Sequence, residues 1–176
     1  NVQGEFFKII DRIGKMPLPY YIKRDPTDKD KDTYQSIFAK TLGAVAAPTA
    51  SLHFSKRIIT ALKKKGVKIV PVTLHIGLGS FRPVEVEDLT KHKMDSEYYE
   101  VPEETAEVVN KTIDSKCNVF VCGTSVCRAL ESSVTTDGHL KSNRGWTDKF
   151  IFPPYDFKIA DKVITNFHMP ESTLIM

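Results

Sequence analysis

The spacing of apolar residues along the chain predicts helices and strands in alternation. In "DTYQSIFAKTLG" apolar side chains recur every three or four positions, Asp32 and Gln35 are spaced as a variant of the capping box, and Gly43 is a stop signal. "KRIITALKKK" repeats this spacing behind Ser55, a good N-cap residue. Four helices are therefore expected, at residues 32–43, 56–65, 102–113 and 123–133.

Short apolar runs between these helices predict β-strands. "VKIVPVTLHIG" is apolar at most positions, which is typical of a strand buried on both faces, although Pro71 requires an edge position or a bulge. Helices that alternate with such strands are typical of an α/β fold, with a largely parallel sheet flanked by helices. The strands are expected at residues 67–77, 117–123 and 161–164.

The composition is that of one ordinary globular domain over residues 1–176, with 41% hydrophobic and 27% charged residues. The sequence contains neither an apolar run of the roughly 18 residues that a membrane span needs nor the layout of a signal peptide. Cys117, Cys122 and Cys127 form no CxxC pair, which disfavours a disulfide framework or zinc knuckle. We therefore expect a cytoplasmic protein without a membrane partner.

The net charge of +3 permits an RNA partner without predicting one, because that inference needs clustered charge. Lys56, Arg57 and the run 63–65 make one predicted helix strongly basic, either as a solvated face or as a surface that lies along phosphates. Tyr20 and Tyr21 either stack on unpaired bases or pack against the neighbouring prolines.

Turns rich in glycine, hydroxyl groups and histidine follow the predicted strands. In α/β sheets ligands collect at the carboxyl ends of strands, so His75 with residues 77–83, the segment 123–128, and "TNFHMPEST" are candidates for one shared cleft. "GTS" at 123–125 begins a helix, and its free backbone N–H groups suit an anion, with Arg128 as a possible clamp. A plain capping turn explains the same residues.

Three of the five histidines, His53, His75 and His168, stand beside turns, where they suit proton transfer near neutral pH. A hydrogen-bonded structural imidazole is the alternative for each. The histidines form neither HxxxH nor HxH, so no metal site is predicted. Asp95 and Glu97 are candidates to orient an imidazole or to act as acids, unless they are surface carboxylates.

Six motifs in order resemble one enzyme family, the S-adenosylmethionine:tRNA ribosyltransferase-isomerases of queuosine biosynthesis. They are "MPLPYYIKR", "DTYQSIFAKTLGAVAAPTASLHFS", "VTLHIGLGSFRPV", "VFVCGTSVCRALES", "GWTDKFIFPPYDFK" and "VITNFHMPESTLIM". The resemblance runs over nearly the whole chain. It implies the family fold, an α/β major domain with an inserted β-barrel, of which this chain resembles a partial α/β catalytic domain without the N-terminal section, the barrel and a C-terminal tail.

The resemblance also implies the reaction. The family transfers and isomerises the ribosyl group of S-adenosylmethionine onto 7-aminomethyl-7-deazaguanine at the wobble position of a tRNA with a queuosine-type anticodon. The products are epoxyqueuosine-tRNA, adenine and methionine. S-adenosylmethionine is thus a stoichiometric donor, no metal is implied, and a monomer is expected.

Matched to the family motifs, the candidate catalytic residues are His53, His75, Arg82 and Glu97. His53 and His75 are both suited to take a proton from the ribosyl carbon that the sulfonium acidifies, and the sequence does not choose between them. Arg82 and Arg128 suit the methionine carboxylate or an RNA phosphate. The candidate substrate-binding residues are Pro48, Thr49, Thr73, Gly77, Gly79, Ser80, Gly123, Thr124, Arg128, Asn166, Phe167, His168, Ser172 and Thr173.

Several positions depart from the family pattern. Ser51 stands where glycine is usual, Asp95 where histidine is common, Tyr20 in place of a proline and Pro154 in place of a glycine. The Asp95 departure puts an acid-base role at that position in doubt. Two rival functions are a non-catalytic tRNA-binding module with the same fold and a methyltransferase, and the second lacks a glycine-rich fingerprint.

Overall fold

A computed structural model of the chain describes residues 6–19, 21–77, 86 and 88–168. The chain divides into two compact units, Asn1–Gln35 and Ser36–Met176. The prediction of a single domain over residues 1–176 stays a prediction, and each unit is described by itself.

The described residues of the first unit, 6–19 and 21–35, form two helices, α1 (Phe6–Ile13) and α2 (Asp30–Thr33). The carboxylate of Asp30 organises the turn before α2, because it accepts two hydrogen bonds from the Arg24 guanidinium, at 2.7 and 2.6 Å, and one from the Thr27 amide at 2.7 Å. These bonds hold the pKa of Asp30 well below its usual range, with the Arg24 bond as the largest cause.

The helix predicted at residues 32–43 is therefore wrong over most of its length, since α2 ends at Thr33. Ser36 is buried, and its hydroxyl accepts the amide of Phe38 at 3.2 Å, a local bond that competes with helical pairing. Leu42 is 85% exposed, so the apolar spacing does not mark a buried helical face.

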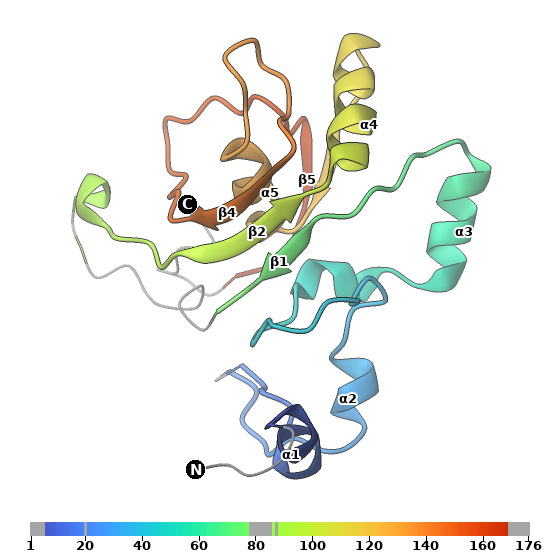
Figure 1. Cartoon of the computed structure of the whole chain (residues 1–176), viewed down its shortest axis with the longest axis vertical. Coiled ribbons are helices and arrows are strands. Elements are labelled where there is room, and N and C mark those ends of the chain that lie inside the picture. The colour runs from blue at the N-terminus through green and yellow to red at the C-terminus, as the bar shows by residue number, and fades with distance from the viewer. Residues whose placement is uncertain (1–5, 20, 78–85, 87, 169–176) are drawn as a thin grey trace. The chain divides into compact units, whose positions relative to one another are not determined.

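The second unit contains two small sheets, with β1, β2 and β4 side by side in Figure 1. β1 (Thr73–His75), β2 (Glu97–Val101) and β4 (Asn143–Thr147) form an antiparallel sheet in the order β1-β2-β4. β3 (Phe120–Cys122) and β5 (Lys162–Ile164) form a parallel pair. The unit mixes helices and strands, but the strict alternation and the largely parallel sheet that were predicted are wrong, because β2 and β4 are additional strands that form an antiparallel sheet with β1.

The helices of this unit follow the sequence signals closely. α3 (Lys56–Lys64) begins after Ser55, whose hydroxyl accepts the Ile58 amide at 3.3 Å. α4 (Glu103–Asp114) begins after Pro102, and α5 (Thr124–Glu131) begins directly after Gly123. Two 3₁₀ turns, η1 (Thr49–His53) and η3 (Leu89–Lys91), complete the described elements.

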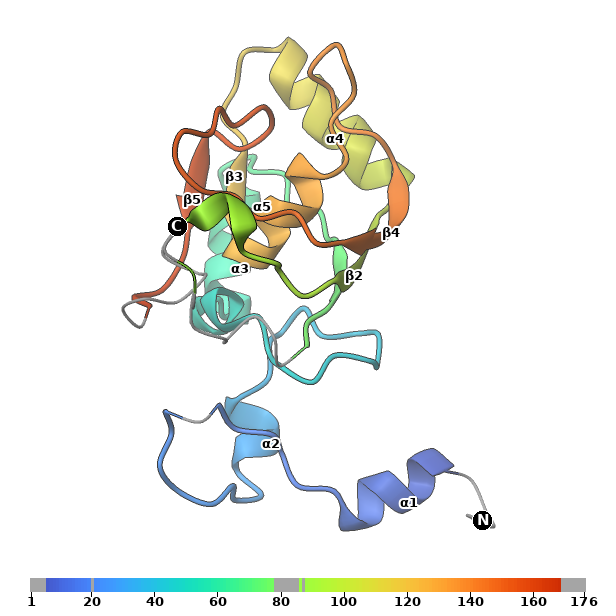
Figure 2. The same ribbon diagram turned by 90° about the vertical axis from the view of Figure 1, so that its left-hand side faces the viewer.

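The core of the unit lies where α5 packs against β2 and β3 (Figure 2), and α4 adds buried side chains to it. α5 lies against both β2 and β3, and so joins the two sheets. The buried side chains of the core include Tyr99, Val101, Val109, Val121 and Leu130. The core thereby fixes the ends of β1, β3 and β5, from which the turns described next extend.

Candidate active site

The stretch "VAAPTASLHF" forms a tight turn that is tied to the end of β1. The amides of Val45 and Ala46 both donate to the carbonyl of Ile76, at 3.0 and 3.2 Å. Pro48 then caps η1, and the hydroxyl of buried Ser51 donates to the Pro48 carbonyl at 2.6 Å. Ser51, where the family usually has glycine, thus closes the turn with its own side chain.

A second turn joins β3 to α5 at Gly123. This residue has φ 102°, ψ 142°, a conformation in which a side chain would be strained, so glycine is required there. Its amide donates to the Ile164 carbonyl at 2.9 Å, which extends the parallel pairing of β3 and β5 by one step. Thr124 and Ser125 follow immediately at the start of α5.

These turns and the segment after β5 surround one pocket. Its walls combine small apolar side chains with several hydroxyl groups and one imidazole. It is lined by Ala47, Pro48, Thr49, Ala50, Leu74, Ile76, Gly123, Thr124, Ser125, Val126, Thr165 and His168. The structure thus brings together Pro48, Thr49, Gly123, Thr124 and His168 of the predicted site.

His53 and Asn166 contact one another, and each follows a segment that lines the pocket. Nε2 of His53 lies 2.8 Å from Oδ1 of Asn166. An amide oxygen only accepts hydrogen bonds, so Nε2 carries the proton of the neutral ring, and Nδ1 has the lone pair and no hydrogen-bond partner among the residues that the structure describes. Asn166 therefore leaves His53 in the tautomer that can act as a base through Nδ1.

His168 has a different environment from His53. Burial lowers its pKa, so the neutral ring is favoured, and its Nε2 lies 3.3 Å from the Thr165 hydroxyl. Phe167, which directly precedes His168 in the sequence, is fully exposed. His168 is thus a neutral, polar member of the pocket wall.

Glu97 and Arg128 form a buried ion pair between β2 and α5. Nη1 of Arg128 donates to Glu97 Oε2 at 3.0 Å, and its Nε donates to the Lys149 carbonyl at 2.9 Å. Burial lowers the pKa of Arg128, and the charge of Glu97 opposes that shift. Glu97 also accepts the amide of Gly77 at 3.3 Å.

Neither member of this pair lines the pocket. The acid role of Glu97 and the clamp role of Arg128 stay predictions. In the structure each of these side chains is the ion-pair partner of the other. Gly77, another predicted residue, is held at its amide by this pair, so the pair anchors the start of the loop after β1.

His75 and Thr73 also lie apart from the residues that line the pocket. Successive side chains of a strand point to opposite faces, and Leu74 and Ile76 are the members of this segment that line the pocket. The His75 ring packs on Tyr98 with a centroid distance of 5.2 Å. Its Nε2 is buried and has no hydrogen-bond partner among the residues that the structure describes.

The close approach of Gly43 to His75 fixes this ring. A Cβ atom at position 43 would lie 2.4 Å from Cε1 of His75, so only glycine fits there. The other predicted residues, Gly79, Ser80, Arg82, Ser172 and Thr173, lie outside the described residues, as does Tyr20.

Several residues that line the pocket were not predicted one by one. Thr165 and Ser125 lie in segments that were predicted to share a cleft, "TNFHMPEST" and "GTS", because both segments follow predicted strands. Leu74 and Ile76 carried no signal beyond their apolar character.

Within residues 6–168, apart from the undescribed positions, no group of three His, Cys, Asp or Glu side chains is arranged to hold a metal ion. Likewise, no helix in the described part of the chain is long and apolar enough to cross a membrane.

Comparison with known proteins defines the class. Residues 1–176 match a family model described as "Queuosine biosynthesis protein", and the chain belongs to this family.

The relatives in this family are named S-adenosylmethionine:tRNA ribosyltransferase-isomerase. The chain is 62% identical to the protein of Cytophaga hutchinsonii, over 98% of this chain and 49% of the relative. It is 56% identical to the protein of Chloroherpeton thalassium, over 100% of this chain and 51% of the relative. The chain therefore spans about half the length of these curated relatives.

A solved structure shares the fold. The crystal structure of an S-adenosylmethionine tRNA ribosyltransferase from Thermotoga maritima matches with a TM-score of 0.57 and 36% sequence identity. The match covers 72% of this chain and 39% of the other.

Proposed function

We propose that the protein containing this chain is an S-adenosylmethionine:tRNA ribosyltransferase-isomerase. It transfers and isomerises the ribosyl group of S-adenosylmethionine onto 7-aminomethyl-7-deazaguanine at the wobble position of tRNA. Epoxyqueuosine-tRNA, adenine and methionine are the products. The observation that carries the proposal is the pocket in which three segments with family motifs, 47–50, 123–126 and 165–168, meet in a chain that belongs to this family.

The pocket's side chains suit the donor. The hydroxyls of Thr49, Thr124 and Thr165 can bond the sugar, while Leu74 and Ile76 offer an apolar wall. At the start of α5 the backbone N–H groups and the helix dipole favour a negative charge, which suits the methionine carboxylate. S-adenosylmethionine is consumed here as a substrate.

His53 is the proposed base. The sulfonium makes the adjacent ribosyl carbon acidic, and imidazole titrates near neutral pH, so a free imidazole lone pair can remove that proton. Loss of adenine follows, the amine of the deazaguanine attacks, and methionine leaves. Neither His53 nor His75 lines the pocket, and His53 is preferred because Asn166 bonds its Nε2 and leaves Nδ1 to act as the base.

We also propose that the partner is a tRNA with a queuosine-type anticodon, and that the enzyme works in the cytoplasm as a monomer without a metal. The missing parts of the family fold, including the β-barrel, are proposed to be supplied by the full-length protein.

The test uses the full-length protein with S-adenosylmethionine and tRNA that carries the aminomethyl-deazaguanine. Mass spectrometry of digested tRNA should find epoxyqueuosine, together with an equal amount of free adenine. His53→Gln should lower the rate by about 10²–10⁴-fold, the usual contribution of a general base. His139→Gln is the control, since His139 bonds Asp114 and Asp137 away from the pocket lining, and it should keep the wild-type rate.

A wild-type protein that binds the tRNA but releases neither adenine nor epoxyqueuosine would contradict the proposed function. That result would favour the non-catalytic tRNA-binding module.

A further inference from the structure

Positive charge is concentrated in one segment of the chain. Residues 55–72 contain six basic side chains and no Asp or Glu, and the six are Lys56, Arg57, Lys63, Lys64, Lys65 and Lys68. The whole chain carries net +3, so the remaining 19 basic and 22 acidic residues carry net −3. The modest overall charge therefore hides a local excess of +6 on and just after α3.

This charge is not neutralised by the described part of the protein. None of the six side chains forms an ion pair with a described residue, and all six residues are exposed. Exposed lysines elsewhere do have partners: Lys91 pairs with Asp88, Lys111 with Glu107 and Lys158 with Asp156. Like charges held together without partners repel one another, and a polyanion relieves that repulsion.

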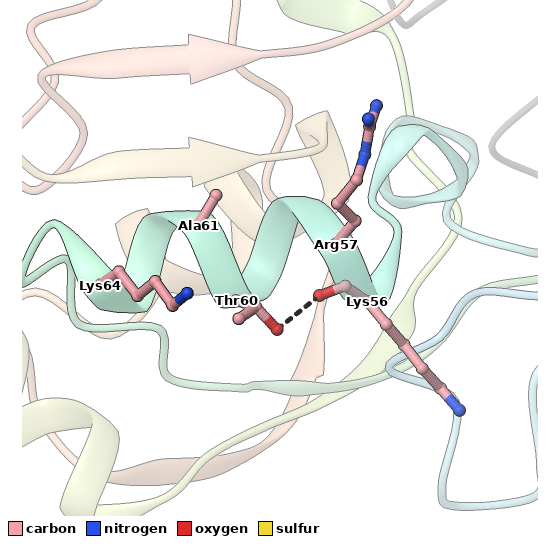
Figure 3. A pocket seen from close by; sticks show the side chains of 5 residues that line it. All are labelled: Lys56, Arg57, Thr60, Ala61 and Lys64. Atoms are coloured by element: carbon pink, nitrogen blue, oxygen red, sulfur yellow. Dashed lines mark hydrogen bonds between the residues drawn. The ribbon is translucent and has the colours of Figure 1, made fainter.

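Three of these basic residues line one hollow on the surface of α3. Lys56, Arg57 and Lys64 line a shallow hollow along α3, and the smaller Thr60 and Ala61 lie between them (Figure 3). The Thr60 hydroxyl donates to the Lys56 carbonyl at 2.9 Å. Positions 56, 60 and 64 share one face of the helix, and they extend over about 12 Å at the usual helical rise.

This face lies next to the candidate active site along the chain. Only Phe54 and Ser55 separate His53 from Lys56, and η1 leads almost directly into α3. We propose that the basic face, defined as Lys56, Arg57 and Lys64, binds tRNA phosphates adjacent to the wobble nucleotide. The inference rests on the proposed function, because it takes tRNA as the substrate.

The test measures tRNA binding by the full-length protein at a series of salt concentrations. The triple variant Lys56→Gln, Arg57→Gln, Lys64→Gln should raise Kd by about tenfold, as expected for three exposed charge contacts. The magnitude of the slope of log K against log salt should fall by about 2–3, since each of the three phosphate contacts contributes roughly 0.7–0.9. The KM for S-adenosylmethionine and the thermal midpoint should stay unchanged, which a structural defect would not allow.

The matched control neutralises three lysines that have acidic partners, in the variant Lys91→Gln, Lys111→Gln, Lys158→Gln. It removes the same charge and should change Kd less than about twofold, because exposed paired charges contribute little. An unchanged Kd and salt slope in the α3 variant, or an equal loss in the control, would overturn the inference. Failure of the proposed function is a separate result, namely no adenine release by a wild-type protein that binds tRNA.

Discussion

The amide oxygen of Asn166 determines which nitrogen of His53 is free. The two residues are 113 positions apart in the chain, and their contact at 2.8 Å depends on the turn at 48–53 lying beside the segment after β5. Both residue types were candidates from the family motifs, but their pairing was not predicted. Because the contact is polar and exposed, it controls proton position rather than stability.

A charge placed at position 166 tests this role. In Asn166→Asp a carboxylate replaces the amide and favours the protonated form of His53. Since the base works unprotonated, the acidic limb of the pH profile of kcat/KM should move to higher pH. Asn166→Ala removes the oxygen without adding charge, and should lower the rate without moving the limb in that direction. Superimposable profiles for the wild type and Asn166→Asp would show that His53 is not the base.

Ser51 shows what a single departure from a family pattern can mean. The resemblance marks it as a change from glycine, and the structure shows the hydroxyl bonded to Pro48 within the turn and 2.8 Å from the Ser36 hydroxyl. No periodicity relates positions 36 and 51, so this buried polar contact could not be predicted from the sequence. Its partner Ser36 is also the residue whose local bonds stop the predicted helix.

At the scale of elements, the helices were easier to predict than the sheet. α3, α4 and α5 begin at local signals, Ser55, Pro102 and Gly123, that act within a few residues. The strands β2 and β4 were missed. In β2 alternate residues Glu97, Tyr99 and Val101 are buried, but an ionised side chain at the first of these positions conceals the alternation.

β4 has an even weaker signal. Its sequence "NRGWT" contains one large apolar residue, Trp146, and that side chain is 70% exposed. The strand exists because its backbone pairs with β2 from Glu97 to Val101, a contact between distant segments. Because this pairing joins segments that are distant in the sequence, it was not predicted, and the structure has one antiparallel sheet and one parallel pair in place of a largely parallel sheet.

The buried pair of Glu97 and Arg128 should dominate the stability of this region. Glu97→Ala leaves the Arg128 charge buried without its carboxylate, and should lower the free energy of unfolding by about 3–5 kcal/mol. Glu100→Ala changes a less buried carboxylate of the same strand, and should cost less than about 1 kcal/mol. Urea denaturation of the full-length protein checks both values. Equal costs for the two variants would show that the pair does not anchor β2 to α5.

At the scale of the whole molecule, the rule that ligands collect at strand ends was more useful than the predicted sheet. The parallel strands β3 and β5 do end together, and the turns that follow them both contribute to the pocket. Residues of β1 divide according to the face they occupy, which explains why Leu74 lines the pocket while Thr73 and His75 do not. Position along the sequence alone could not separate them, since it does not show which face is turned to the site.

In the proposed function, S-adenosylmethionine binds in the pocket formed by segments 47–50, 123–126 and 165–168. Amide hydrogen exchange of the full-length protein, with and without S-adenosylmethionine, measures this binding segment by segment. We expect slower exchange in these three segments when the donor is bound, and unchanged exchange in residues 134–140, none of which line the pocket. Slower exchange confined to other parts of the protein, with these three segments unaffected, would contradict binding in this pocket.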